Sequence, residues 1–312
     1  MPDTTLIHRG RTTLGWLLAP ATEAVPRPQA VGAAALRILL GLLWLYNVSW
    51  KRAPDFGQDA DNGLFKFTSY AVSHPVFAPY SWVVEHLVLP VFTPFGWMVL
   101  VAETTLAVLL LTGAWVRLAA AIGVAQSLAI ALSVAYAPNE WPWSYWLMIG
   151  AHVVILFSSA GRVLAVDGLR AGLLSSRALG QFWGGLTTLL GAYSVVRSFG
   201  DPLAVRGPGL VSSNLSISLG EYNLLGGLVL VIVGVLMVTA TRGGPRAAVR
   251  GAAVLAALAG LSLHAQLGFT DPILGGTATS AAYYFSVAVV ALFLGAPADA
   301  GSRSPSHDRS SR

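Results

Sequence analysis

Long apolar runs with few or no charges constrain the fold of this chain more than any other feature. Each run is about 18 to 20 residues long, the length that a helix rising 1.5 Å per residue needs to cross a hydrocarbon layer of about 30 Å. Within lipid, only helices and closed barrels satisfy every backbone polar group, and the runs lack the two-residue alternation of barrel strands. The eight runs cover residues 31–50, 95–113, 118–137, 144–162, 180–199, 223–241, 252–269 and 279–296.

The composition agrees with burial in lipid rather than in water. Charged residues make up 11% of the chain and the mean hydropathy is +0.66, whereas about 25% of the residues in an average soluble domain are charged. The absence of cysteine excludes disulfides, thiolate metal sites and cysteine-bound iron–sulfur clusters from this chain. We therefore predict an all-α, polytopic integral membrane bundle of about eight transmembrane helices, which can be grouped into two four-helix halves.

Basic residues set the predicted orientation. Thirteen of the 19 lysines and arginines fall on one side of the predicted helices, and only Lys51, Arg52, Lys66 and Arg206 fall in loops on the other. By the positive-inside rule, the N-terminus and the C-terminus are both cytoplasmic. The net charge of +5 is thus a topology signal and does not indicate nucleic-acid binding. We expect a multi-pass protein of a bacterial inner (plasma) membrane.

The same pattern predicts the organisation along the chain. A cytoplasmic N-terminal segment covers residues 1–30, four-helix membrane domains cover 31–170 and 171–296, and a disordered cytoplasmic tail covers 297–312.

Two shorter segments are predicted to lie at the membrane surface. Thr13 to Ala19 is too short to cross the membrane. The stretch from Phe65 to Phe95 is apolar but repeatedly broken by proline, so we expect an interfacial or re-entrant cap, or a loop that covers the helix ends.

Ionisable side chains inside a membrane helix are costly, and each one needs a partner or a function. Arg37, Trp44, Asn47 and Lys51 recur at spacings of three or four residues and share one face of the first helix. Glu103 lies about ten residues, or about 15 Å, above the cytoplasmic end of the second helix. Arg37 lies about six residues, or about 9 Å, above that of the first, an offset that an arginine side chain can cover. We therefore predict a buried Arg37–Glu103 pair, which either locks the helices together or forms part of a polar pocket that binds a ligand or relays protons.

Further polar residues line the later helices. Tyr145, His152 and Ser159 recur every seven residues in the fourth helix, and Gln126 and Ser133 form a thinner stripe in the third. His152 is either a hydrogen-bonded core residue or part of a site.

His264 and Arg197 are the remaining ionisable residues within the runs, and His264 stands among apolar neighbours. Two unmatched histidines are a very weak haem signal, so we predict neither metal nor haem. Lys51 and Arg52 are either solvated anchors at the external interface or an anion-binding pair.

Several motifs resemble the DoxX/DoxD family of bacterial and archaeal membrane proteins. They include Leu36-Arg37-Ile38-Leu39-Leu40-Gly41 followed by Lys51, then Glu103, Leu109-Leu110-Leu111-Thr112-Gly113 and Arg117, then Glu140-Trp141-Pro142-Trp143-Ser144-Tyr145, and finally Gly161-Arg162 with Asp167. The match covers about residues 33–168 and is closest to the DoxD-type small subunit of thiosulfate:quinone oxidoreductase. The family is usually four helices long, and the second half here has no clear copy of the Arg37 or Glu103 positions.

The resemblance implies a membrane subunit of a quinone-linked oxidoreductase, which passes electrons from a small sulfur compound such as thiosulfate to the quinone pool, usually with a partner subunit or a soluble redox protein. The implied cofactor is a membrane quinone. A quinone site needs an apolar slot, hydrogen-bonding groups and a proton route. The predicted catalytic residues are Glu103, Arg37 and His152, the predicted cofactor-binding residues are Trp44, Asn47, Tyr145 and Arg117, and the predicted substrate-binding residues are Lys51 and Arg52.

Two other functions remain open at this point. The chain is an anchor or scaffold that recruits redox or sulfur-handling proteins, or it is a transporter of a small anion. The transporter is suggested by the intramembrane charges and by the apparent four-plus-four repeat.

Overall fold

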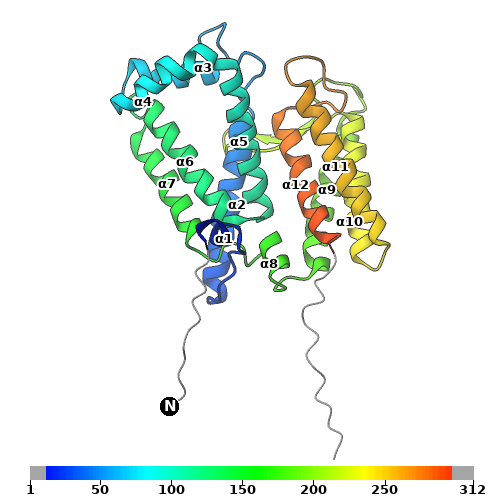
Figure 1. Ribbon diagram of the computed structural model, residues 1–312. Helices are drawn as coiled ribbons and strands as arrows, with labels where there is room; N and C mark the ends of the chain where they lie inside the picture. The colour runs from blue at the N-terminus through cyan, green and yellow to red at the C-terminus, as the bar shows by residue number, and fades with distance from the viewer. Residues whose placement is uncertain (1–11, 297–312) are drawn as a thin grey trace, which may run out of the picture.

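The computed structural model describes residues 12–296, and the predicted disordered tail at 297–312 lies outside the described residues. Figure 1 shows two sets of upright helices side by side, with short elements across both ends. All eight apolar runs form helices, although α7 ends earlier than expected, at Leu156. The fold is thus mostly helical, as predicted.

The first helix set contains four long helices that pack against one another. The N-terminal turn of the first helix carries Pro28, which is tolerated there because the first amides have no partner within the helix. The second helix ends at Gly113, whose φ of +66° is the left-handed conformation that suits glycine. These helices are α2 (Arg27–Val48), α5 (Phe92–Thr112), α6 (Val116–Val134) and α7 (Pro142–Leu156).

A cap lies across the top of the first helix set in Figure 1. It begins with α3 (Gly63–Ser73) and continues through α4 (Ala78–Val83), a π-helical turn η1 (Val84–Val88) and a 3-10 turn η2 (Leu89–Val91) directly into α5. Tyr80 of α4 ties the cap to α6, because its hydroxyl lies 2.9 Å from the hydroxyl of Ser133. The broken segment from Phe65 to Phe95 therefore forms a cap of short helices, but from Ala78 onward it runs without a break into α5 as one apolar helical segment.

The second helix set is held together by close backbone approach. Its helices are α9 (Ser176–Arg197), α10 (Leu224–Thr241), α11 (Arg246–Gln266) and α12 (Ala278–Leu294).

Paired glycines bring α9 and α10 together. A Cβ atom on Gly191 would lie 2.7 Å from the carbonyl oxygen of Gly227, and one on Gly234 would lie 2.6 Å from that of Gly184. Small residues at such crossings are typical of membrane helix pairs, because lipid supplies little hydrophobic force between helices.

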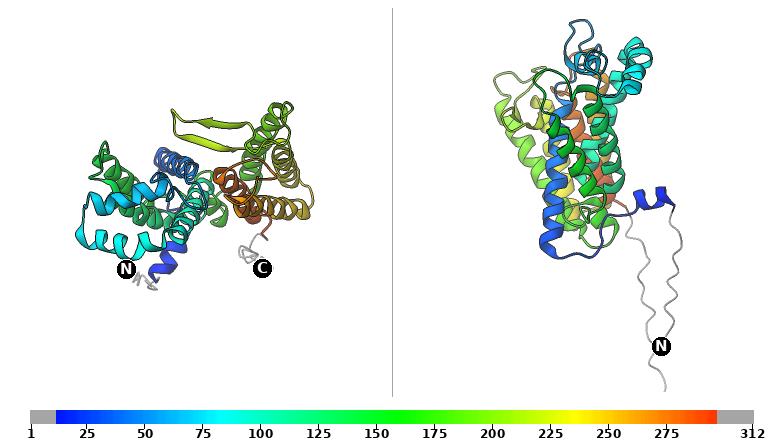
Figure 2. Two further views of the ribbon diagram at one scale, coloured as in Figure 1. Left: turned by 90° about the horizontal axis from the view of Figure 1, so that it is seen from above. Right: turned by 90° about the vertical axis from the view of Figure 1, so that its left-hand side faces the viewer.

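A hairpin joins the two sets. Strands β1 (Gly209–Ser212) and β2 (Ile217–Glu221) pair antiparallel, and β2 contacts both α12 and α2. Figure 2 shows this hairpin beside the two sets when the molecule is seen from above. The hydroxyl of Thr279 in α12 also donates to the carbonyl of Leu45 in α2, at 3.1 Å.

Two short helices, α1 (Thr13–Leu18) and α8 (Val166–Arg170), lie at the end opposite the cap (Figure 1). Helix α1 does not enter the bundle, and Leu14 is exposed. The ring of Trp16 packs near Phe157, with ring centroids 5.8 Å apart. Helix α1 has six residues, too few to cross a membrane, and its position at the membrane surface stays a prediction.

Five helical segments are long and apolar enough to cross a membrane. Helices α7 and α12 are apolar but shorter, with 15 and 17 residues. The five segments are Arg27–Val48, Ala78–Thr112, Val116–Val134, Leu224–Thr241 and Arg246–Gln266. The chain is therefore a helical membrane protein.

Candidate functional site

Arg37 is fully buried, and backbone carbonyls surround its guanidinium group. Nε donates to the carbonyl of Ala160 at 3.0 Å, and Nη1 donates to those of Leu110 and Leu111, the latter at 3.1 Å. Nη2 donates to the carbonyls of Val163 at 3.3 Å and Leu164 at 3.0 Å. The side chain thus satisfies carbonyls at the C-terminal end of α5, which have no partner within the helix.

The predicted Arg37–Glu103 pair is therefore wrong. Arg37 lies level with Leu110 and Leu111, whereas Glu103 lies about two helical turns away along α5, or about 12 Å at 1.5 Å per residue. All three nitrogens of Arg37 already donate to the backbone, so this side chain stabilises the fold at that end of the bundle.

The carboxylate of Asp167 accepts hydrogen bonds from backbone amides, just as Arg37 donates hydrogen bonds to backbone carbonyls. Its carboxylate is fully buried at the start of α6 and accepts from the backbone amides of Trp115 at 3.1 Å, Val116 at 3.0 Å and Ala21 at 3.3 Å. Arg170 donates to the same carboxylate at 2.7 Å. A negative charge at a helix N-terminus is favourable, because the free amides and the helix dipole point toward it.

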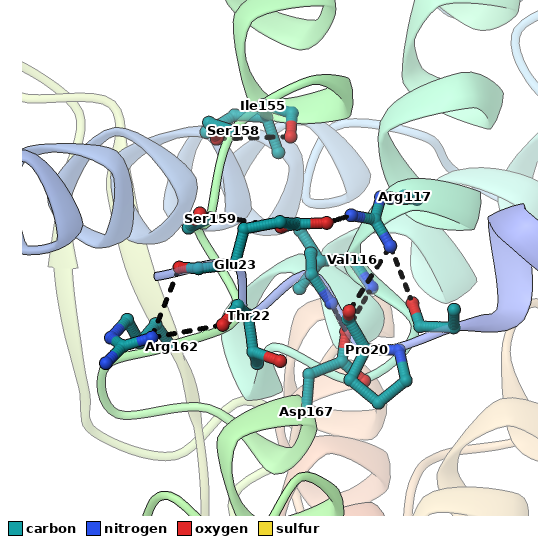
Figure 3. A network of polar contacts seen from close by, with 12 residues as sticks. Pro20, Thr22, Glu23, Val116, Arg117, Ile155, Ser158, Ser159, Arg162 and Asp167 are labelled. Carbon is teal, nitrogen blue, oxygen red and sulfur yellow. Dashed lines mark hydrogen bonds and ion pairs between the residues drawn. The ribbon is translucent and has the colours of Figure 1, made fainter. Parts of the chain in front are cut away.

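A third network at this end holds the N-terminal segment in place, and Figure 3 shows it from close by. Arg117 forms an ion pair with Glu23, and it also donates to the carbonyl of Pro20 at 3.2 Å. Arg162 donates to the carbonyls of Thr22 at 3.1 Å and Glu23 at 3.2 Å. Arg117, a predicted cofactor-binding residue, therefore binds the N-terminal segment at the end of the bundle and lies away from its middle.

The buried partner of Glu103 is Lys51. The two side chains form an ion pair with exposed fractions of 1% for Lys51 and 2% for Glu103. Lys51 Nζ also donates to the carbonyl of Asn47 at 3.2 Å, and Gln126 of α6 donates to Glu103 Oε1 at 3.3 Å. This cluster lies at the C-terminal end of α2, midway along α5.

His152 lies in a second, neutral cluster. The indole N–H of Trp44 donates to His152 Nε2 at 2.9 Å. Because an indole nitrogen is only a donor, Nε2 is the acceptor, and the ring proton is on Nδ1, 2.8 Å from the carbonyl of Met148. Gly123 makes room for the ring, since a Cβ atom there would lie 2.0 Å from His152 Cδ2. Both ring nitrogens are therefore engaged with the protein.

The side chains of three other predicted site residues bond elsewhere or are exposed. The hydroxyl of Tyr145 donates to Glu140 at the start of α7. The side-chain oxygen of Asn47 accepts from the indole of Trp50 at 2.8 Å. Arg52 is exposed, just beyond the end of α2. Lys51 is buried, so the predicted pair of external cations, Lys51 and Arg52, does not form one anion site.

The remaining two ionisable residues of the apolar runs belong to the second helix set. Arg197 ends α9 and is exposed. His264 of α11 faces the first set, with its ring centroid 5.7 Å from that of Trp97 on α5. His264 Nδ1 is buried and has no hydrogen-bond partner among the described residues.

The Lys51–Glu103–Gln126 cluster is the part of the bundle that is best suited to chemistry. A buried acid and base can exchange a proton without changing the net charge of the cluster, and intramembrane acids of this kind form proton relays. The hydroxyls of Thr104 and Ser127, next in sequence to Glu103 and Gln126, are buried without a hydrogen-bond partner among the described residues. No group of three metal-binding side chains occurs in residues 12–296.

Sequence reasoning assigned no role to Asp167 or Glu23. Asp167 belongs to the motifs that resemble the DoxX/DoxD family, so that signal was present. Glu23 lies in a segment without periodicity, and nothing in its neighbourhood indicated a partner.

Comparisons of the chain with models of known protein families, with curated proteins and with solved structures gave no significant match. The family resemblance therefore remains a prediction that rests on the motif residues.

Proposed function

We propose that this chain is the membrane subunit of a quinone-linked oxidoreductase that passes electrons from a small sulfur compound, such as thiosulfate, to the quinone pool. The observation that carries the proposal is the buried Lys51–Glu103 pair beside Gln126. A quinone that is reduced to a quinol takes up two electrons and two protons. The site must therefore deliver protons inside the membrane, which is the service that a buried acid–base pair provides.

The residues present fit a quinone headgroup. The carboxyl group of Glu103 can carry a proton or accept a hydrogen bond. The side-chain amide of Gln126 can donate one hydrogen bond and accept another. Lys51 then acts as the proton reserve for Glu103, because it touches the carboxylate and lies at the end of α2 nearest the external loop.

Electrons must come from another protein in this proposal. The sequence contains no cysteine, so this chain forms neither a persulfide nor a cysteine-bound iron–sulfur cluster. A partner subunit or soluble redox protein therefore oxidises the sulfur compound.

The proposed topology has eight crossings in two four-helix halves, both termini in the cytoplasm and a bacterial inner membrane. Its support is that α1 and the end of α12 lie at the same end of the molecule (Figure 1). The arginines of that end are the ones that the positive-inside rule assigns to the cytoplasm.

Mass spectrometry of organic extracts tests the proposal, with protein purified in mild detergent. We expect near-stoichiometric quinone in the wild type and its loss in Glu103→Gln, which keeps the shape of the side chain but removes its proton. Tyr283→Phe is the matched control, because Tyr283 is buried in the second helix set and its loss leaves the cluster intact. Wild-type protein with no more quinone than an unrelated membrane protein contradicts the proposal.

An anchor or scaffold is the second candidate. It is favoured by the end of the molecule that carries α1, where Arg37, Asp167 and Arg117 all serve to hold the chain together. Exposed arginines such as Arg177 and Arg242 surround this end and are suited to docking a soluble partner. In that case Glu103→Gln changes abundance or assembly and no intrinsic activity, and partners co-purify through the cytoplasmic loops.

A further inference from the structure

A hollow of about 320 Å³ lies just beyond the C-terminal end of α2, outside the Lys51–Glu103 cluster. It is formed by the loop that leads from α2 to α3. Its lining residues are Trp50, Arg52, Phe56, Gly57, Asn62 and Gly63.

The loop around this hollow has a fixed shape. The amide of Asn62 donates to the carbonyl of Gly57 at 3.0 Å, and that of Phe65 donates to the carbonyl of Phe56 at 3.1 Å. Phe56 is only 1% exposed and packs on Gly96, where a Cβ atom would lie 2.3 Å from its ring. The hollow is therefore part of the folded structure.

Backbone strain is concentrated in the same loop. Phe56 and Asp61 have φ values of +54° and +45°, which non-glycine residues rarely adopt. Gly57 has φ +90°, and a Cβ atom there would lie 2.2 Å from the carbonyl oxygen of Asn62. Strained residues persist where the surroundings hold them, and they cluster at ligand clamps.

Trp50 gives the hollow a rigid aromatic wall. Its indole N–H donates to Asn47, its ring packs edge-on against Phe67 with centroids 5.6 Å apart, and Lys51 Nζ lies 4.0 Å from its centroid. A ring that is held in this way loses little conformational entropy when a flat ligand stacks on it.

Arg52 supplies the charge of the hollow. It is the one charged residue that lines it, and its side chain makes no hydrogen bond or ion pair with any residue between 12 and 296. The aspartates of the same loop, Asp55, Asp59 and Asp61, are not among the lining residues. A free guanidinium group next to an aromatic wall is suited to a planar anionic group, which it binds through two parallel hydrogen bonds.

We propose that this hollow binds an organic anion with a flat apolar body, whose carboxylate or sulfonate group bonds to Arg52 while its body stacks on Trp50. The volume favours this class over a bare inorganic oxyanion, because cavities of about 300 Å³ and above take small organic ligands. The inference does not rest on the proposed function, since neither Glu103 nor a quinone enters it.

Titration calorimetry with naphthalene-2-sulfonate tests the assignment, using full-length protein in phosphatidylcholine nanodiscs and empty nanodiscs as the blank. We expect one saturable site in the wild type, binding at least tenfold weaker in Arg52→Gln, and unchanged binding in Lys66→Gln. Lys66 is the matched control because it is exposed in the cap and does not line the hollow. Trp50→Leu is expected to weaken binding as well, and Arg52→Lys to give an intermediate affinity.

Three results would overturn the assignment. The first is equal affinity in Arg52→Gln and wild type. The second is displacement of the probe by equimolar sulfate, which would indicate a simple anion site. The third is loss of binding in phosphatidylglycerol nanodiscs but not in phosphatidylcholine nanodiscs at the same high salt concentration, which screens repulsion between the bilayer and the probe; it would indicate that a lipid headgroup fills the hollow. Binding that is unaffected by sulfate and by the lipid change supports the proposal.

Discussion

The two helix sets bury different kinds of groups. The interior of the first set contains Arg37, Lys51, Glu103 and Asp167, all at most 5% exposed. Among the described residues of the second set, every buried polar side chain is uncharged, and its helices approach through glycines and small residues. The first set thus buries charged side chains between its helices, whereas the second set relies on close contact between helix backbones.

The difference shows which charges are structural and which are available for function. Arg37 and Asp167 lie at helix ends, where they satisfy backbone groups that any helix must leave open. Lys51 satisfies one carbonyl in the last turn of α2, that of Asn47. Among the described residues, Glu103 satisfies no helix end: it lies midway along α5 and pairs with Lys51 and Gln126, so its position is not required by the helical fold itself. This difference supports our proposal that the function lies in the first set, at the Lys51–Glu103–Gln126 cluster.

The largest expected loss of stability comes from replacing Arg37, which donates to five backbone carbonyls. Arg37→Leu leaves several buried carbonyls without donors, and we expect a loss of about 4 kcal/mol or more in the free energy of unfolding. Thermal unfolding and the yield of monodisperse protein in detergent measure it. Arg37→Lys should fall between, because an ammonium group has three donors and no fork. Arg197→Leu, at an exposed arginine of the second set, should change little, and equal losses in the two leucine variants would contradict the assignment.

The next largest loss of stability is expected at the glycine seam of the second set, where Gly184 and Gly191 of α9 pack against Gly234 and Gly227 of α10. Gly191→Ala places a Cβ atom 2.7 Å from the carbonyl oxygen of Gly227, so α9 and α10 must separate. We expect a loss of about 1–3 kcal/mol in the free energy of unfolding. Gly185→Ala is the matched control on the same helix, because nothing lies within 4 Å of its Cβ position and alanine is the better helix former. A loss in Gly185→Ala as large as that in Gly191→Ala would mean that the seam is not where the helices meet.

Two buried tryptophans, Trp44 in the first set and Trp183 in the second, allow the stability contributed by one side-chain hydrogen bond to be compared between the sets. Trp44→Phe removes the donor to His152, whereas Trp183→Phe removes an indole N–H that has no partner among the described residues. Both tryptophans are nearly fully buried, so the loss of ring volume is similar. We expect Trp44→Phe to be the more destabilising by about 1 kcal/mol, the usual net value of one hydrogen bond. Chemical unfolding of the two variants measures the difference, and the reverse order would contradict the tautomer assigned to His152.

The smallest expected effect is a pH dependence at the hairpin of the second set. Burial raises the pKa of Glu221 above its ordinary value, and nearby Arg206 opposes the shift only in part. A raised pKa means that the folded state favours the protonated carboxyl. This contribution to stability is present below the unfolded pKa of about 4.3 and is lost as the pH rises through the folded pKa. Hydrogen exchange of the hairpin amides should therefore be slower at pH 4 than intrinsic rates alone predict, and Glu221→Gln should remove the difference.

The helices and the cap were predictable from the sequence, because apolar run length and proline positions are local signals. The partners of Arg37 were not. Three of its acceptor carbonyls come from residues 160–164, an irregular segment after α7 with no periodicity to place it. The early end of α7 at Leu156, which creates this segment, was equally hidden in an apolar run that continues to residue 162.

The burial of Lys51 was missed for a related reason. Its position just after an apolar run suggested an external loop. However, α5 continues through η2 into the cap, and it extends beyond the end of α2. Residues at the end of α2 are therefore enclosed, and Lys51 lies level with the middle of α5. Depth along one helix was readable from the sequence, but the relative heights of two helices were not.

A double-mutant cycle on Lys51 and Glu103 tests the central claim most directly. Stability in detergent is measured for Lys51→Met, Glu103→Gln and the double variant, with Arg37→Met and Glu103→Gln as the parallel cycle. We predict that Lys51 and Glu103 are coupled by about 2 kcal/mol or more, because either one alone is an uncompensated buried charge, whereas Arg37 and Glu103 lose stability additively. Additive losses for Lys51 and Glu103, or strong coupling of Arg37 with Glu103, would contradict the account.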